Sequence, residues 1–196
     1  IKISNSIVDL NGGNHAGVTH GNGVYTSGDF DVTLENLIVS SSTASGISLN
    51  LSENMTVRHT AIHNSLSGPG IRVSNDSVTG NFTQNSFYGN RGLSVDLLRN
   101  DSTSMIEGVN ENSGNLNPDY GNLGVDHPVV TTAYYSDSSL LIEGYVGDSV
   151  GSAVFSGAIV EIYSALVGEG DTYMADSYGE GLKYLGSTLV DSSGSF

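Results

Sequence analysis

Acidic and basic side chains in the first half of the chain could support the reaction of a polysaccharide lyase. A lyase on a coiled β scaffold needs a carboxylate cluster for Ca²⁺ and a neighbouring Arg or Lys that abstracts a proton beside a uronate carboxylate. Asp29, Ser52 and Asp76 would stack on one turn of a repeat, and Arg72 lies four residues before Asp76. The set is one carboxylate short and has no clear base. We therefore expect solvated turn residues and predict no catalytic residue, with a lyase or hydrolase fragment as the alternative.

The His residues do not indicate a hydrolase. The five His lack the paired spacing with a carboxylate that marks a zinc hydrolase. His15 and His20 flank Gly17 and could bind a metal ion. A polar loop is the simpler expectation there.

An acidic loop near the C-terminus is the candidate Ca²⁺ site. Residues 168–176, with Glu180 nearby, carry oxygen ligands at uneven spacing that departs from the EF-hand pattern. We expect either Ca²⁺ bound by Asp171, Asp176 and Glu180 or, more simply, acids that keep this region soluble. No other cofactor is predicted.

Five sequons make N-linked glycosylation a hypothesis. They begin at Asn50, Asn54, Asn75, Asn81 and Asn100. Asn54 and Asn81 directly precede Met55 and Phe82, which we expect to point inward, so both Asn side chains should point outward. In a chain rich in Asn, Ser and Thr, some sequons also arise by chance.

The elements that position these residues are predicted by an internal repeat. Gly-aliphatic pairs recur at intervals of 22 to 24 residues, at Gly23-Val24, Gly46-Ile47, Gly70-Ile71 and Gly92-Leu93. Between them, residues 32–39 align with 55–62 and 80–87, and residues 3–8 match 34–39. Short alternating runs separated by Ser, Asn and Gly predict about three strands per repeat. One such unit is a coil of a parallel β-helix, whose backbone groups stay unpaired until the next coil stacks on it.

The repeat register brings two sets of polar residues together. Asn5, Asn36, His59 and Gln84 fall in one file, which we expect to be a ladder of side chains that satisfies the turn from coil to coil, with a polar row for a ligand as the alternative. Glu35 and Arg58 occupy equivalent positions in neighbouring coils. They should form an exposed ion pair, and a sugar-binding charge pair is the alternative.

The chain divides near residue 122, because no Asn follows Asn122. We predict β-helix coils over residues 1–98, a loop-rich connector over 99–128 and a β-sandwich over 129–196. Four longer alternating runs indicate an antiparallel sandwich of immunoglobulin-like type, with a fifth strand beginning at Phe196. We expect the open edge at Phe196 to serve assembly, since an unpaired edge accepts another strand. The chain looks like a piece of a longer polypeptide.

Composition limits the partners. Six Lys plus Arg against 21 Asp plus Glu give a net charge of −15, so nucleic acid is a poor partner. No apolar stretch is long enough for a membrane span. The absence of Cys excludes disulfides and thiolate metal sites. A composition rich in Ser, Thr, Asn and Gly suits an extracellular scaffold.

Three segments near the C-terminus carry a family resemblance. They are Gly179-Glu180-Gly181, Tyr184-Leu185-Gly186-Ser187 and Ser193-Gly194-Ser195-Phe196. With the coil repeats and a connector containing Asn117-Pro118-Asp119-Tyr120-Gly121, they resemble large secreted bacterial and archaeal surface proteins, in which a right-handed parallel β-helix precedes a short sandwich. The resemblance implies an all-β fold and an extracellular or cell-surface location, but no reaction.

We therefore expect a structural or adhesive surface protein, with assembly into a fibre or sheath through strand edges. Its partners would be other copies, neighbouring modules of a longer chain or surface glycans. The alternatives are the enzyme fragment above and a carbohydrate-binding module, for which the Tyr residues of the C-terminal region could supply stacking surfaces.

Overall fold

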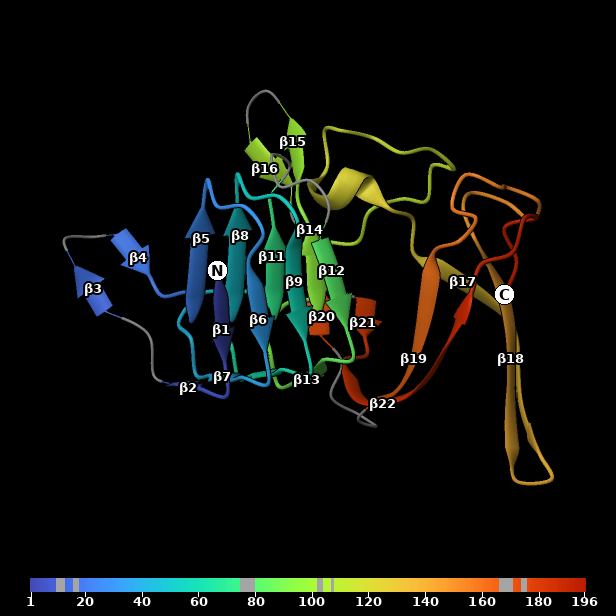
Figure 1. The fold of residues 1–196 in the computed structure, drawn as a ribbon, viewed down its shortest axis with the longest axis horizontal. Helices are drawn as coiled ribbons and strands as arrows, with labels where there is room; N and C mark the ends of the chain where they lie inside the picture. The colour runs from blue at the N-terminus through green and yellow to red at the C-terminus, as the bar shows by residue number, and fades with distance from the viewer. Residues whose placement is uncertain are drawn as a thin grey trace.

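The protein is described by a computed structural model covering residues 1–9, 13–15, 18–74, 80–101, 104–106, 108–165, 171–173 and 176–196. Figure 1 shows a stack of short parallel strands followed by longer antiparallel strands. The helical part of the described chain is one short 3₁₀ turn, η1 (Gly121–Gly124). No helix among the described residues is long and apolar enough to cross a membrane. The predicted all-β fold is confirmed.

Three parallel sheets of four strands form the coil stack. Sheet 1 contains β1 (Lys2–Ser4), β6 (Thr33–Glu35), β9 (Met55–Arg58) and β12 (Gly80–Thr83). Sheet 2 contains β2 (Ile7–Asp9), β7 (Ile38–Ser40), β10 (Ala61–His63) and β13 (Ser86–Tyr88). Sheet 3 contains β5 (Val24–Ser27), β8 (Ile47–Asn50), β11 (Ile71–Val73) and β14 (Val95–Leu97). Each coil contributes one strand to each sheet, which is the architecture of a parallel β-helix.

The register confirms the sequence alignment in three coils and corrects it in the fourth. Val24 pairs with Ile47 and Ile47 with Ile71, as the glycine anchors predict. The strand that stacks on Ile71 begins at Val95, however, so the anchor at Gly92-Leu93 is wrong. Gly92 instead donates its N–H to the carbonyl of Gly68, in the turn before the strand.

The core of the stack is a column of inward apolar side chains. Alternation along each strand sends every second residue inward. Leu34, Val57 and Ile62 are completely buried, and the column continues to Phe87 in the last coil. A core this thin depends on each coil covering its neighbour.

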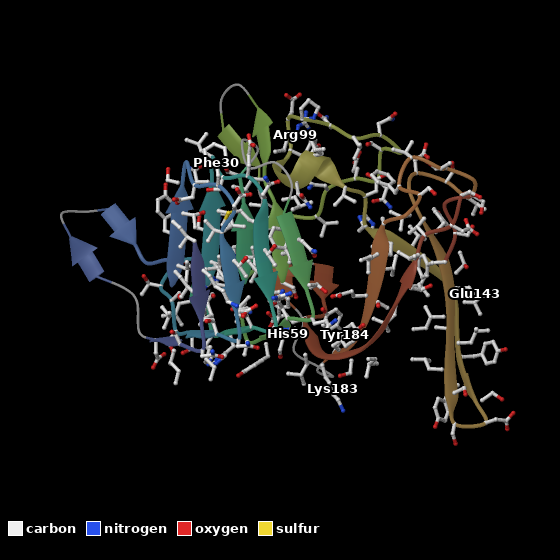
Figure 2. The ribbon with its side chains drawn as sticks, viewed as in Figure 1. Phe30, His59, Arg99, Glu143, Lys183 and Tyr184 are labelled. Atoms are coloured by element: carbon white, nitrogen blue, oxygen red, sulfur yellow. The ribbon has the colours of Figure 1, made fainter. Side chains whose placement is uncertain are left out.

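The corner between sheet 1 and sheet 2 is built from left-handed residues. Asn5, Asn36, His59 and Gln84 all have φ between 50° and 53°. Asn is tolerated there because its short polar side chain can bond locally. Figure 2 places His59 at the outer margin of the stack.

Three small hairpins lie outside the coil sheets. They pair β3 (Gly13–His15) with β4 (Val18–His20), β15 (Arg99–Asp101) with β16 (Ser104–Ile106), and β20 (Asp171–Tyr173) with β21 (Asp176–Tyr178).

The C-terminal region contains two antiparallel sheets of two strands each. One pairs β17 (Pro128–Ser136) with β18 (Ser139–Val146), and the other pairs β19 (Ile159–Ala165) with β22 (Gly181–Leu189). A second core of Val146, Phe155, Val160 and Val190 joins the two sheets. These are the strands predicted for the sandwich. The β17–β18 hairpin extends away from the rest of the chain (Figure 1), with Glu143 exposed on it (Figure 2).

Candidate functional site at the end of the coil stack

The last coil is covered by the C-terminal strands. An uncovered coil would present the unpaired backbone groups of its edge strands to other chains. β22 lies beside β13, and the hydroxyl of Ser86 donates to the carbonyl of Leu182 at 2.6 Å. The C-terminal region is therefore joined to the stack by direct contacts.

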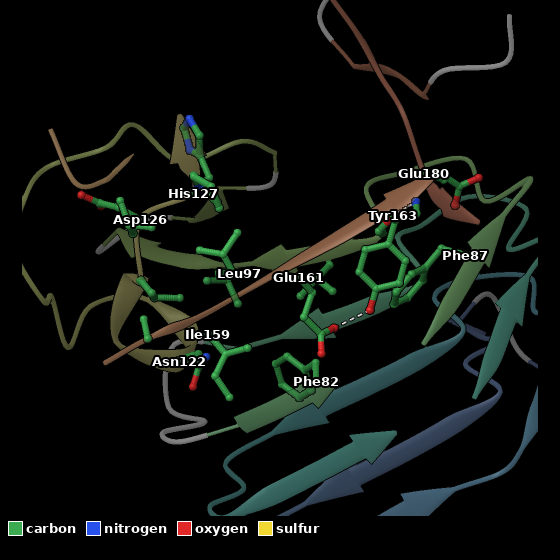
Figure 3. A pocket seen from close by; sticks show the side chains of 18 of the residues that line it. Phe82, Phe87, Leu97, Asn122, Asp126, His127, Ile159, Glu161, Tyr163 and Glu180 are labelled. Carbon is green, nitrogen blue, oxygen red and sulfur yellow. Dashed lines mark hydrogen bonds between the residues drawn. The ribbon is translucent and has the colours of Figure 1, made fainter. Parts of the chain in front are cut away.

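Glu161 of β19 covers the corner after β12. One carboxylate oxygen accepts the backbone N–H of Gln84 at 2.9 Å, and the other accepts the hydroxyl of Thr83. The hydroxyl of Tyr163 donates to the same carboxylate (Figure 3). One acidic side chain thus satisfies the backbone N–H that a further coil would otherwise have bonded.

Glu180 covers the next corner. Its carboxylate accepts the backbone N–H of Asn90 at 3.1 Å and the side-chain amide of Asn90 at 2.7 Å. The residue is only 5% exposed. Burial raises the pKa of this carboxyl above its usual value, and the two bonds from Asn90 oppose that shift.

The third edge is covered by the connector. Gly121 of η1 donates its N–H to the carbonyl of Leu98 at 2.9 Å, and the N–H of Gly80 donates to the side chain of Asn122 at 2.7 Å. All three sheets therefore end against residues that follow the coils in the sequence.

A cavity of about 670 Å³ lies between the last coil and the C-terminal strands (Figure 3). Phe82, Phe87 and Leu97 line it from the coil, and Ile159 and Tyr163 line it from β19. Its wall is therefore partly the open end of the stack's own core.

Tyr163 is held between the cavity and a second aromatic ring. Its ring meets that of Tyr184 edge-on, with 5.7 Å between centroids. Burial raises the pKa of the Tyr163 hydroxyl, and its hydrogen bond to Glu161 adds to the shift. The hydroxyl is therefore a stable proton donor to the carboxylate.

The predicted ladder residues are brought together, but mainly through their backbone. The N–H of Asn36 donates to the carbonyl of Arg58, and the N–H of His59 to that of Thr83. Nε2 of His59 lies 3.0 Å from Oε1 of Gln84. These four residues are stacked left-handed corners, and their role as a ligand row or ladder stays a prediction.

A second amide pair satisfies the turns, and sequence reasoning missed it. Buried Asn85 accepts the N–H of Thr60 at 3.1 Å and donates to the carbonyl of Val57 at 2.8 Å. Asn90 accepts the N–H of Ser65 at 3.1 Å and donates to the carbonyl of Ile62 at 2.9 Å. The sequence signal for this pair is one Asn immediately before the strand 86–88 and a second Asn two residues after it.

The Glu35–Arg58 pair is present but less exposed than expected. Both Nε and Nη2 of Arg58 donate to Glu35, at 2.9 and 2.6 Å. Lys2 of the first coil pairs with the same carboxylate from the other side. Glu35 is therefore only 8% exposed, because it lies between two cations. Hydrogen bonds from Lys2 and then Arg58 lower the pKa of its carboxyl.

The Ca²⁺ site at Asp171, Asp176 and Glu180 stays a prediction. The side chains of Asp171 and Asp176 lie outside the described part of the chain, and Glu180 is occupied by Asn90. No group of three or more His, Asp or Glu suited to a metal ion occurs among the described residues.

Only part of the set considered for lyase activity and metal binding at His15 and His20 lies within the described residues. Ser52 is buried and shares a hydrogen bond with Thr26 at 3.0 Å, so it does not face solvent beside Asp29. Asp76 lies outside the described residues. The side chains of His15 and His20 are likewise not described.

Three of the five sequon residues lie on or next to strands of the coil sheets. Asn54 and Asn81 are exposed, as predicted, while Asn50 is half-buried. Asn75 and the side chain of Asn100 lie outside the described residues.

Phe196 lies against an existing strand. Its N–H and carbonyl bond reciprocally with Gly144 of β18, each at 3.0 Å. Its assembly role stays a prediction.

Comparison with known proteins bears on the coil stack. A model for the right-handed beta helix region matches residues 22–120, just over half of the chain. No solved structure matches. The match includes strands β5 to β14, which contribute to all three parallel sheets, and it continues through the connector to Tyr120. The chain belongs to the family of proteins with a right-handed β-helix region.

Proposed function

We propose that this chain is a stiff structural or adhesive module of an extracellular surface protein. The observation that carries the proposal is the covered end of the stack, where Glu161 and Glu180 bind the last coil directly. Two units connected in this way behave as one body, whereas a flexible linker would leave their orientation free. The β-helix is then a spacer, and the C-terminal sheets, read as an immunoglobulin-like sandwich, are the next module along it.

Composition supports an extracellular location. The chain has a net charge of −15 and exposed sequon residues at Asn54 and Asn81. A high negative charge keeps such a surface soluble and repels anionic partners. Intact-mass measurement of native material tests glycosylation, because a mass equal to the bare polypeptide would contradict it.

Strand edges are the proposed route of assembly with other copies or neighbouring modules. On β18, Gly144 already accepts an antiparallel partner at Phe196. Backbone pairing of this kind adds a strand without a dedicated pocket.

Small-angle scattering and negative-stain microscopy of the purified chain test stiffness and assembly together. We expect one elongated particle shape with a fixed angle between the stack and the C-terminal sheets. A broad distribution of angles would contradict the spacer role, and strictly monomeric particles at high concentration would contradict assembly. Immunogold labelling of the source cells tests the location.

A further inference from the structure

The cavity at the end of the stack has the size and lining of a ligand site. Its volume of about 670 Å³ lies within the roughly 300–1,000 Å³ typical of small-molecule pockets. Phe82, Phe87 and Leu97 of the last coil form an apolar floor, and Ile159 of β19 lines the cavity at its solvent-exposed side. An apolar molecular body would gain by leaving water here.

The carboxylates of this cavity are its main charged groups. Glu161 and Glu180 line it at the β19 and β22 side, and the hydrogen bonds that they accept within the described part of the chain come from neutral donors. Asp126 also lines it, with its carboxylate accepting the backbone N–H groups of Ser113 and Gly114. Among the described lining residues there is no Lys or Arg, and His127 is the one group there that can carry a positive charge.

The negative charge of the cavity therefore determines which head group an apolar ligand should carry. Carboxylates in a partly desolvated site attract a cation more strongly than they would in water, and they repel an anion. Glu161 lies between Phe82 and Tyr163, so the charge sits against the apolar floor (Figure 3). A fatty acid would bring a second negative charge to this point, whereas an ammonium group would neutralise the first.

We propose that this cavity binds a small amphiphilic monocation, with the apolar body against the last coil and the ammonium group at Glu161. This site goes beyond the spacer function and does not depend on it.

A matched ligand series on the unmodified full chain tests the selectivity. Hexylammonium, hexan-1-ol and hexanoate share one apolar body and differ in charge. We expect calorimetric affinity in that order, with about tenfold or more between the ammonium and the alcohol, because both can donate a hydrogen bond to Glu161 but only the ammonium also forms an ion pair with it. Equal affinity for the ammonium and the alcohol, or stronger binding of hexanoate, would overturn the proposal.

Two substitutions separate the cavity from the acidic surface. Ala158→Phe places a ring in the cavity without changing charge, and Glu161→Gln keeps the shape while removing the charge. We expect the first to abolish hexylammonium binding and the second to erase its advantage over hexanol. Gly186→Ala, at a site with open space around it, is the control and should bind as the unmodified chain does.

A nuclear magnetic resonance measurement on the unmodified chain tests the site even if a variant does not fold. In the unmodified chain, nuclear Overhauser contacts should connect the hexyl protons to the rings of Phe82 and Tyr163. Contacts with other surface rings instead would show adventitious adsorption and would reject the site.

Discussion

Among single residues, buried Asn85 has the largest expected influence on stability. Its amide satisfies one backbone N–H and one carbonyl in the turn between two coils, and it is only 2% exposed. Asn85→Ala would leave both groups buried without partners, at a cost of about 2–4 kcal/mol. Urea unfolding measures this loss. Asn81→Ala, at an exposed position of the same coil, is the control, and equal losses in the two variants would refute the role of Asn85.

The contribution of Glu35 to the stability of the fold should depend on pH. Its pKa is lowered in the fold by Lys2 and Arg58. The ionised carboxyl therefore stabilises the fold above its ordinary pKa, and this contribution is lost as the pH falls through the lowered value. The difference in unfolding free energy between the unmodified chain and Glu35→Gln should shrink from about pH 6 to about pH 3. A constant difference over that range would contradict the prediction.

Glu180 should show the opposite slope, since burial raises its pKa. Its contribution is fully present below the ordinary value and is lost as the pH rises through the raised one. The pKa values of Glu35 and Glu180 are thus shifted in opposite directions, because the two side chains have different surroundings. Neither environment is visible in the residue's immediate sequence.

At the scale of the strand and turn, the glycine anchors set how closely coils stack. A Cβ built on Gly46 would lie 2.4 Å from Cγ2 of Ile62 and 2.8 Å from the carbonyl oxygen of Gly70. Gly46→Ala should therefore cost about 1–3 kcal/mol through overpacking.

The control for this prediction is Gly186→Ala on β22, where no atom lies within 4 Å of the added carbon. We expect its urea midpoint to match or slightly exceed that of the unmodified chain, because Gly weakens a strand. If Gly46→Ala behaved like the control, the coils would have room to separate, and the close stacking would be disproved.

For the whole molecule, the question is whether the stack and the C-terminal sheets unfold together. Glu161 and Glu180 carry the charged contacts between them. Replacing both with Ala should split one calorimetric transition into two or lower its midpoint, because the backbone N–H of Gln84 and the buried N–H of Asn90 both lose their partners. Glu143→Ala, on the exposed hairpin, removes one exposed carboxylate and should leave the transition unchanged. A single unshifted transition in the double variant would show that the two parts are joined by other means.

Periodicity alone predicted most of the coil stack. Residues 3–8, 32–39, 55–62 and 80–87 align in the structure as they do in the sequence, because the inward positions must be apolar in every coil. The error at Gly92-Leu93 has a local cause. Ser94 replaces Gly before the last strand of sheet 3, so the anchor motif is absent there.

The amino-acid sequence by itself determined the repeat, the strand positions and the pairing of Glu35 with Arg58, since each follows from a spacing of about one coil. Only the tertiary structure decided that Lys2 joins that pair, that Glu161 and Glu180 cover the last coil, and that a cavity separates them from its core. These contacts connect residues 33 to 90 positions apart. The 22- to 24-residue repeat does not predict the Lys2 contact, because 33 residues separate Lys2 from Glu35. It does not predict the contacts of Glu161 and Glu180 either, because these depend on where the C-terminal strands pack on the finished stack.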